Sequence, residues 1–330
     1  MPRVVRFHQI GGPDVLQIED LPLQQPKENE LRLKVEALGL NRAEARFRAG
    51  LYVEKPVFPA RLGYEAAGIV DAVGPNVTEF KIGDRVSTIP SLSQSSYGVY
   101  GESAVVPVQA VVRYPPSFSA VEGAAVWMRF LTAWGGLIHH GKLSAGQTAL
   151  ITAASSSVGL AAIELASLAG ARSIAVTRTS AKKQALLDFG ATYAIASAEE
   201  DLPAAVSKYT DGKGANVIFD PIAGKFIEVL AQAAAPGGQI IIYGSLSLEP
   251  TPFPSASAIP KGLTVRGYTL FGIISDPPLR AEAVKYIYDQ LEQGKLKPKI
   301  DRSFLLTQIA DAHRYLESNQ QIGKVVVVVD

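Results

Sequence analysis

The first third of the chain carries short apolar runs separated by glycine and proline. Examples are LRLKVEALGL at 31–40, GIVDAVG at 68–74 and ESAVVPVQAVVRYPP at 102–116. Runs of this length between turn-forming residues are typical of β-strands. Residues 2 to about 122 are therefore predicted to form a β-rich domain.

The pattern changes at about residue 123, where apolar strands begin to alternate with helices. The predicted strands are TALIT at 148–152, SIAVT at 173–177, NVIFD at 216–220, QIIIY at 239–243 and LTVRGY at 263–268. Helical periodicity lies between them, as in VGLAAIELASLAGA at 158–171 and AKKQALLDFGA at 181–191, where Gly190 is a helix stop. This alternation predicts the α/β class, with a doubly wound parallel sheet covered by helices on both faces.

The end of the chain is predicted to return to the β-rich half. Two helical stretches, 281–294 and 307–319, precede the terminal run VVVVV. We therefore expect a discontinuous catalytic domain, 1–123 with 266–330, around a nucleotide-binding domain at 124–265. The serine-rich SLSQSSYGVYG at 91–101 is expected to be a flexible flap.

Composition narrows the function classes. The 330 residues exceed one ordinary core of about 150 residues, so two domains are expected. Hydrophobic residues make up 47%, and 32 Lys and Arg against 31 Asp and Glu give a net charge of +1, with no footprint for nucleic acid or an anionic membrane. The absence of Cys excludes disulfides, thiolate nucleophiles and cysteine-ligated zinc. With no signal-peptide core and no apolar run of about 20 residues, a soluble cytoplasmic protein is expected.

A dinucleotide-binding turn is predicted where the strand at 148–152 feeds the next helix. Such a turn aims helix N–H groups at a pyrophosphate and normally carries glycines three residues apart. Here that spacing holds Ala153, Ser156 and Gly159. The turn and the ends of the later strands are expected to contact the cofactor through Ser156, Ser157, Val158, Asp220, Gly244 and Ser245.

The end of the second strand selects between NAD and NADP. An NAD site needs an acid there for the ribose 2′-hydroxyl, whereas an NADP site needs cations. The chain reads RTSAK from Arg178 to Lys182, with no acid before Asp188. An Arg178 guanidinium binds phosphate bidentately and Lys182 adds a charge, so NADPH is the expected cofactor; a solvated basic turn is the alternative.

Four segments resemble the medium-chain dehydrogenase/reductase superfamily and, within it, the zinc-free quinone oxidoreductase (zeta-crystallin-like) branch. They are ALGLNRAEARFRAGLY, LGYEAAGIVDAVGPNVTEFKIGDRV, FLTAWGGL and ITAASSSVGLAAIELASLAGA. The final AHRYLESNQQIGKVVVVV is similar to the end of the same family, so the resemblance spans nearly the whole chain. It implies a GroES-like catalytic domain, a Rossmann domain and a homodimer.

The resemblance also bears on metal chemistry. Asn41 stands where zinc-dependent relatives carry a cysteine, Tyr64 stands where they carry a histidine, and the third ligand position falls near Met128. This set implies a site with no metal and no Lewis acid to hold an alkoxide. The hydride is then expected to go to an acceptor that is already electrophilic, a quinone or a C=C bond conjugated to a carbonyl.

Tyr52 and Asn41 are the catalytic candidates that the resemblance implies. Tyr52 aligns with a tyrosine that lines the nicotinamide cleft or donates a proton, and a phenol with a pKa of about 10 stays protonated at neutral pH. Asn41 is expected near the nicotinamide or the acceptor carbonyl. A packed loop tyrosine and an asparagine that satisfies a turn are the respective alternatives.

Further residues take roles only through the resemblance. Those implied to contact the cofactor are Thr132, Phe271, Ile273 and Lys324. Tyr64 and Arg129 are expected at the substrate pocket, although a helix-surface position is the alternative for Arg129 and a solvated lysine is the alternative for Lys324. Glu65 is expected to serve structure.

The function expected from these observations is an NADPH-dependent, zinc-independent quinone reductase. One alternative is reduction of α,β-unsaturated carbonyls or enoyl thioesters with the same residues. Another is a non-enzymatic, NADPH-binding structural or RNA-binding protein, which the near-zero net charge disfavours. The expected partner is a small-molecule electrophile, with neither nucleic acid nor membrane.

Overall fold

The computed structural model describes residues 1–329, which form two compact units. Unit 1 comprises Met1–Met128 together with the segment from Lys297 onward, and unit 2 comprises Arg129–Leu296. Both ends of the chain therefore belong to the same unit. Within residues 1–329, none of the helices combines the length and apolar character that a membrane span requires.

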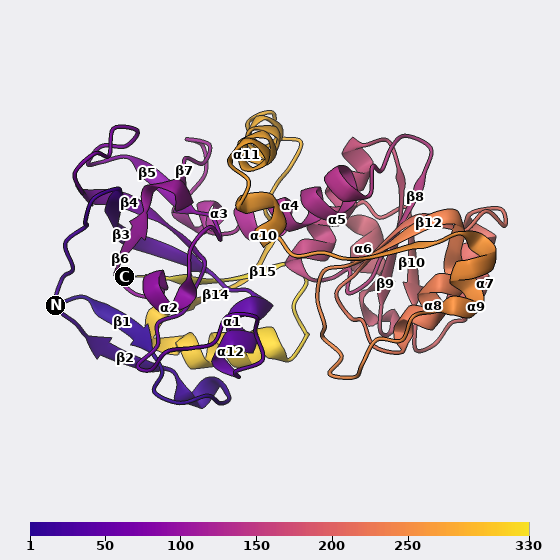
Figure 1. Cartoon of the computed structure of the whole chain (residues 1–330), viewed down its shortest axis with the longest axis horizontal. Helices are drawn as coiled ribbons and strands as arrows, with labels where there is room; N and C mark the ends of the chain where they lie inside the picture. The colour runs from indigo at the N-terminus through magenta and orange to yellow at the C-terminus, as the bar shows by residue number, and fades with distance from the viewer. Residues whose placement is uncertain (330) are drawn as a thin grey trace. The chain divides into compact units, whose positions relative to one another are not determined.

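Unit 1 is built on a seven-stranded sheet in the order β14-β15-β3-β4-β5-β7, with β6 paired to β3 (Figure 1). Its neighbours are antiparallel except β14 and β15, which are parallel. The strands are β3 (Glu30–Gly39), β4 (Glu65–Val73), β5 (Arg85–Thr88), β6 (Ser103–Pro107), β7 (Val111–Val112), β14 (Ile300–Leu305) and β15 (Lys324–Val328). A separate pair joins β1 (Arg3–Arg6) to β2 (Gln17–Asp20).

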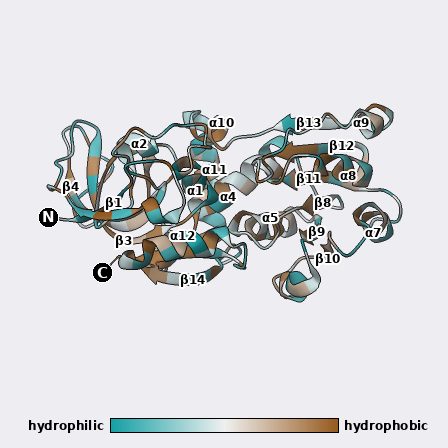
Figure 2. Cartoon of the chain, turned by 90° about the horizontal axis from the view of Figure 1, so that it is seen from below, coloured by the Kyte–Doolittle hydropathy of each residue, from teal (hydrophilic) through white to brown (hydrophobic). Residues whose placement is uncertain are grey.

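Short helices pack around this sheet. They are α1 (Arg42–Arg48), α2 (Gln94–Tyr97), α3 (Ala120–Gly123) and α12 (Ile309–Glu317), with the 3₁₀ turns η1 (Pro13–Val15), η2 (Val108–Ala110) and η5 (Leu306–Gln308). Helix α12 buries Ile309, Ala312, His313 and Leu316 on one stripe, and Figure 2 shows it banded in brown and teal. That spacing is the amphipathic pattern of a helix lying on a core.

Unit 2 carries a six-stranded, fully parallel sheet in the order β10-β9-β8-β11-β12-β13. The strands are β8 (Thr148–Ile151), β9 (Arg172–Thr177), β10 (Tyr193–Ala196), β11 (Ala215–Asp220), β12 (Ala234–Ile242) and β13 (Thr264–Gly267). This is the Rossmann strand order. The first three strands are added in one direction from β8 and the next three in the other, while all six strands run parallel. The predicted α/β fold with a doubly wound parallel sheet is confirmed; the short strand β10 was not among the predicted strands.

Helices fill the connections of unit 2. Helix α4 (Trp127–Ala133) leads into the π-helix η3 (Trp134–His140). The remaining helices are α5 (Ser157–Leu168), η4 (Ser180–Lys182), α6 (Lys183–Asp188), α7 (Leu202–Tyr209), α8 (Phe226–Ala233), α9 (Ser255–Lys261), α10 (Phe271–Ile274) and α11 (Pro277–Glu292). Leucine, isoleucine and valine side chains of α7 and α8 pack on those of the strands to form one continuous core. Strand β8, all four residues of which are buried, has the largely apolar character that a sheet covered on both faces requires.

The expected domain boundary after residue 265 is wrong. Strand β13 crosses it, running from Thr264 to Gly267 in parallel with β12. The helices that follow also belong to unit 2, because the Tyr286 ring of α11 lies 6.4 Å from the Trp134 ring and a Cβ on Gly135 would meet Tyr268 and Ile273 within 3 Å. The second boundary therefore falls after Leu296 and the first after Met128.

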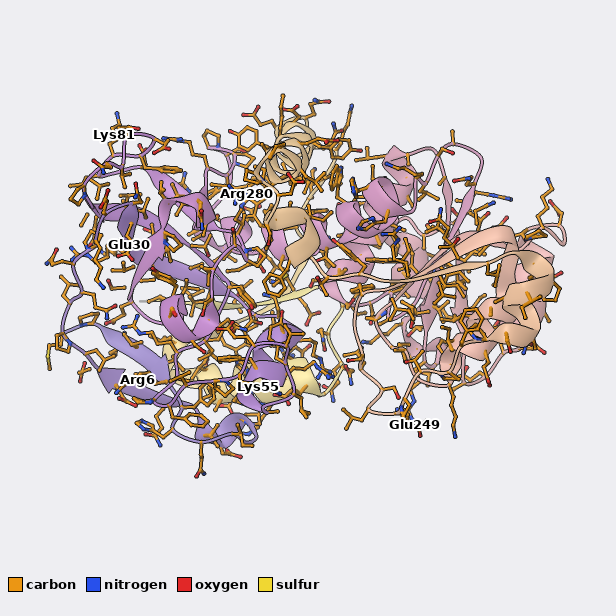
Figure 3. All side chains as sticks on the ribbon, in the orientation of Figure 1. Arg6, Glu30, Lys55, Lys81, Glu249 and Arg280 are labelled. Carbon is orange, nitrogen blue, oxygen red and sulfur yellow. The ribbon has the colours of Figure 1, made fainter. Side chains whose placement is uncertain are left out.

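The flexible flap expected at residues 91–101 is instead an anchored turn of helix. Ser93 caps α2, and its hydroxyl donates to Glu54 Oε1 at 2.5 Å. The backbone amides of Gln94 and Ser95 donate to the same carboxylate, each at 3.1 Å. Lys55, labelled in Figure 3, follows Glu54 in the loop that these bonds tie to α2.

Candidate active site

A buried polar cluster lies at the start of β4, α1 and β15 in unit 1. Asn41 caps α1, and Glu44 completes the capping box by accepting from the Asn41 backbone at 2.7 Å. The Asn41 Nδ2 donates to Glu65 Oε2 at 3.0 Å, and Lys324 Nζ donates to Asn41 Oδ1 at 2.6 Å. Lys324 also forms a buried ion pair with Glu65. One buried ammonium thus contacts both Glu65 and Asn41.

This cluster gives Asn41 and Lys324 a structural role. Both ends of the Asn41 amide are bonded inside unit 1, where the side chain positions Glu65 and Lys324. Contact of Asn41 with a nicotinamide or an acceptor carbonyl stays a prediction. Lys324 is 1% exposed, which rules out a solvated lysine and commits the ammonium to the cluster. Burial raises the pKa of Glu44 to about 7. Glu65 has the structural role expected of it.

The three positions that the resemblance compares with zinc ligands carry no set of anionic donors. Asn41 supplies an amide, Tyr64 a protonated phenol, and the Met128 backbone N–H donates to Glu65 Oε1 at 2.8 Å. In residues 1–329 there is no grouping of three His, Asp or Glu side chains suited to a metal. Neutral amide, phenol and thioether groups are poor partners for a zinc ion, which prefers imidazole and thiolate.

Tyr52 lies in the loop after α1 and contacts Tyr64 edge-on, with ring centroids 6.3 Å apart. Burial raises the pKa of Tyr52 to about 12, while a hydrogen bond from Tyr64 acts in the opposite direction. The phenol therefore keeps its proton at neutral pH, as a proton donor must. Tyr64 is fully buried, with its ring against that of Tyr52, and its place at the substrate pocket stays a prediction.

The predicted dinucleotide turn of unit 2 joins β8 to α5. Ala153 has φ of +46°, a left-handed conformation at the position where a glycine is usual. The Ser156 hydroxyl caps α5 by accepting from the Gly159 N–H at 3.0 Å, which leaves the first two helical N–H groups, of Ser157 and Val158, for an anion. A Cβ on Gly159 would lie 2.6 Å from Ala154 backbone atoms. The serines are thus compatible with the turn.

The two predicted phosphate-binding cations lie at the end of β9. Lys182 Nζ donates to Ser155 Oγ at 3.2 Å, which brings this lysine to the dinucleotide turn. Arg178 is exposed, and within residues 1–329 its side chain has no hydrogen-bond or ion-pair partner. The nearby Glu199 accepts from the Ser180 backbone N–H at 3.1 Å and so holds the start of η4. A free guanidinium and a tethered ammonium therefore flank the turn.

Several other predicted cofactor contacts have structural roles in unit 2. Asp220 is fully buried, bonds the Thr152 hydroxyl and accepts from the Ala223 N–H at 2.7 Å, so it ties the ends of β8 and β11 together. Ile273 is fully buried beside Gly135. A Cβ on Gly244 would lie 2.9 Å from the Pro221 carbonyl oxygen, which explains the glycine by close packing.

The remaining candidates differ in exposure. Arg129 is 0% exposed and pairs with Glu164 of α5 at 2.8 Å, so the helix-surface alternative is wrong. Thr132 is buried, Phe271 is half-buried and Ser245 is exposed. Contact of these four residues with a cofactor or substrate stays a prediction.

Known proteins match nearly the whole chain. Residues 27–116 match the alcohol dehydrogenase GroES-like domain family, and residues 157–284 match the zinc-binding dehydrogenase family. The quinone oxidoreductase of Pongo abelii is 31% identical over 99% of this chain and 98% of its own. This chain belongs to the zinc-independent quinone oxidoreductase family of medium-chain dehydrogenases/reductases. The resemblance stated from the sequence is confirmed, and the protein is an oxidoreductase of this family.

Solved structures agree on the fold of this family member. A quinone oxidoreductase of Escherichia coli, in complex with NADPH, has a TM-score of 0.91 at 29% identity and covers 99% of both chains. An NAD-dependent alcohol dehydrogenase has a TM-score of 0.91 at 32% identity, covering 99% of this chain and 100% of its own. The CurK enoyl reductase has a TM-score of 0.89 at 27% identity, covering 100% and 99%.

Sequence reasoning on this oxidoreductase missed Glu44, Glu54 and Gln94. Glu44 had a local signal, since Asn followed three residues later by Glu is a capping-box pattern. Gln94 and Glu54 had none, because their partners lie about 30 to 40 residues away in the sequence. Only the fold brings Gln94 to the loop that carries Tyr52 and Glu54.

Proposed function

We propose that this protein is an NADPH-dependent reductase that passes a hydride to a quinone. The observation that carries the proposal is the pair of cations at the end of β9, the uncommitted Arg178 and the turn-bound Lys182. A guanidinium binds a 2′-phosphate through parallel N–H bonds, and an ammonium adds charge at the same place. NADH lacks that phosphate, so these residues favour NADPH.

The dinucleotide turn suits this cofactor in a second way. The N–H groups of Ser157 and Val158, at the positive end of α5, face the side on which a pyrophosphate binds in this topology. Gly159 keeps the helix close to the sheet. When bound, NADPH supplies the hydride. The residues of the dinucleotide turn are proposed to orient it, and Tyr52 is the proposed proton donor to the reduced acceptor.

A quinone is an acceptor that can be reduced without a metal ion, and unit 1 offers poor metal ligands. A Lewis acid assists the reduction of an ordinary aldehyde or ketone by stabilising the alkoxide, and Asn41, Tyr64 and Met128 are poor zinc ligands. A quinone is electrophilic without that help, because its reduction gives a stabilised phenolate. Tyr52, whose pKa burial raises to about 12, keeps its proton at neutral pH and is proposed to donate a hydrogen bond to such an oxygen.

Reduction of an activated C=C bond is the second candidate. The CurK enoyl reductase has the same fold along nearly the full length, and an enolate oxygen presents the same demand for one proton as a hydroquinone oxygen. A homodimer and a cytoplasmic location remain predictions.

The test is to follow NADPH oxidation by the purified protein at 340 nm with an ortho-quinone and, separately, with a medium-chain 2-enal. Turnover of the quinone, with NADPH strongly preferred over NADH, supports the proposal. Turnover of the enal alone moves the protein to the double-bond reductases. If NADPH binds and neither acceptor is reduced, the substrate assignment is wrong. If NADPH does not bind, the proposed cofactor falls as well.

A further inference from the structure

A small cavity, open to solvent, lies in unit 1 between the β1–β2 pair and β6. Three polar side chains line it, those of Arg61, Ser103 and Gln24, and the rest of its wall is Val4, Val105 and two prolines. Arg61 lies in the loop before β4, Ser103 opens β6, and Gln24 follows β2. The lining includes none of the residues proposed for catalysis or cofactor binding.

The position of Arg61 is fixed by its neighbour in the chain and by the end of α2. The preceding residue, Ala60, exchanges two backbone hydrogen bonds with Phe7, at 2.9 and 3.0 Å. A Cβ on Gly98 would lie 2.8 Å from the Arg61 Cβ, so the stem of the arginine packs closely there. The side chain is half-buried, and its guanidinium has therefore lost part of its contact with water.

The Arg61 guanidinium has no anionic partner in the part of the chain that the structure describes. The carboxylates on the neighbouring strands are matched to other arginines. Glu102 pairs with Arg3 at 2.7 Å, and Glu19 of β2 pairs with Arg6 of β1, which Figure 3 labels. A partly desolvated cation without a counter-charge is unfavourable, and a bound anion would relieve that cost.

The two neutral polar groups of the cavity are also uncommitted. Among residues 1–329, neither the Ser103 hydroxyl nor the Gln24 side-chain amide has a hydrogen-bond partner. Each can donate, through an O–H or an N–H. Burial lowers the pKa of Arg61 and the Arg6 charge acts in the same direction, but a guanidinium stays protonated throughout the pH range of a folded protein. Donors from three segments thus surround one cavity.

We propose that this cavity binds a small monocarboxylate, with Arg61 on the carboxylate oxygens and Ser103 and Gln24 as further donors. A guanidinium fits the two oxygens of a carboxylate through parallel N–H bonds. One unpaired cation matches a single negative charge, which favours a carboxylate over a phosphate dianion. The apolar wall, with Val4 and Val105, suits a short alkyl group next to the carboxylate.

The test uses propionate as the probe and the full chain as the protein. Binding is followed by saturation-transfer NMR of the propionate methyl protons and by calorimetric titration. Contacts of this number and kind predict a Kd on the order of 1 mM. At about ten times the Kd, propionate should raise the melting temperature by about 2 to 4 °C, and sodium chloride at the same ionic strength should not.

Three variants locate the binding site. Arg61→Gln removes the charge and keeps an amide, and it should weaken propionate binding about 20-fold through loss of a charge-assisted contact. Ser103→Ala removes one neutral donor and should weaken binding about threefold. The matched control is Arg113→Gln, which removes an exposed arginine of the same unit and should leave the Kd unchanged. Without propionate, Arg61→Gln should melt no lower than the unmodified protein, because no internal ion pair is lost.

The possible outcomes decide the proposal without reference to the reductase activity. A Kd that Arg61→Gln leaves unchanged, or no binding at about ten times the expected Kd, overturns the site. Equal stabilisation by chloride, or tighter binding of inorganic phosphate, overturns the carboxylate as its ligand. A large fall in the melting temperature of Arg61→Gln without propionate would mean that the guanidinium has a partner in the folded chain, and it also overturns the proposal. Quinone reduction is measured separately, so neither result determines the other.

Discussion

Replacing the buried His313 should change how the stability of unit 1 depends on pH. His313 is fully buried on α12, where its Nδ1 lies 2.7 Å from the Arg48 guanidinium. Because a guanidinium only donates, Nδ1 is the acceptor and the imidazole is neutral. Burial, aided by the Arg48 charge, lowers the pKa of His313 to about 3 from an ordinary value of 6.5.

The sign and size of the effect follow from this shift. Below pH 6.5 the unfolded chain binds a proton that the folded chain refuses, so the contribution of His313 to stability falls as the pH falls. At about pH 5 the loss is about 2 kcal/mol, since each pH unit below 6.5 costs about 1.4 kcal/mol. Glu44, whose pKa burial raises to about 7, acts in the opposite direction over this range.

The variant His313→Asn isolates the histidine. The asparagine oxygen can still accept from Arg48, but the side chain does not titrate. Urea unfolding followed by circular dichroism, at about pH 5 and about pH 7.5, should show the variant gaining about 2 kcal/mol relative to the unmodified protein on acidification. His139→Asn, in unit 2, is the control for loss of an imidazole from a less enclosed site. Equal differences between His313→Asn and the unmodified protein at both pH values would refute the reasoning.

Three other predictions concern single contacts. Ala153→Gly should raise the free energy of unfolding by about 1 kcal/mol, because glycine adopts the positive φ without strain; thermal melting checks it, and a lowered melting temperature would contradict it. Glu65→Gln and Lys324→Met should each destabilise by about 3 to 5 kcal/mol by leaving one buried charge, and the double variant by much less than their sum, as urea unfolding would show. Arg178→Ala should weaken NADPH binding by about 30-fold, with NADH unaffected, in a fluorescence titration; equal losses for both cofactors would argue against a 2′-phosphate contact.

The fold could be predicted from the sequence where apolar runs are long. Strands β8, β9, β11 and β12 each contain a short apolar run, such as Ile240–Ile242 in β12, between helical stretches, and a buried parallel sheet favours that pattern. Strand β10 was missed because Tyr193–Ala196, with two alanines among its four residues, has a weak β-strand signal. The second boundary was misplaced because the helices after β13 are amphipathic and polar, so nothing in their sequence says which core they cover.

Some residues of the candidate site could also be predicted from the sequence, and others could not. The basic pair Arg178 and Lys182 could be predicted, because a strand end and a turn lie a fixed distance apart in a Rossmann unit. The Asn41 and Lys324 contact could not, since the two residues are 283 positions apart and neither has a local pattern that names the other. The role of Lys324 depends on whether its side chain is buried, and a single sequence does not show this.

The position of β15 sets an order for synthesis. This strand lies between β14 and β3, and its first residue supplies the ammonium that the buried carboxylates of unit 1 need. Unit 2 is continuous from 129 to 296 and is complete when its last helix leaves the ribosome. Until the final strand emerges, residues 37–39 of β3 lack their partner on the side opposite β4, although residues 30–34 on that side already pair with β6. A nascent chain of this protein therefore holds an open, apolar sheet edge through most of its translation, which is the period when chaperones are needed.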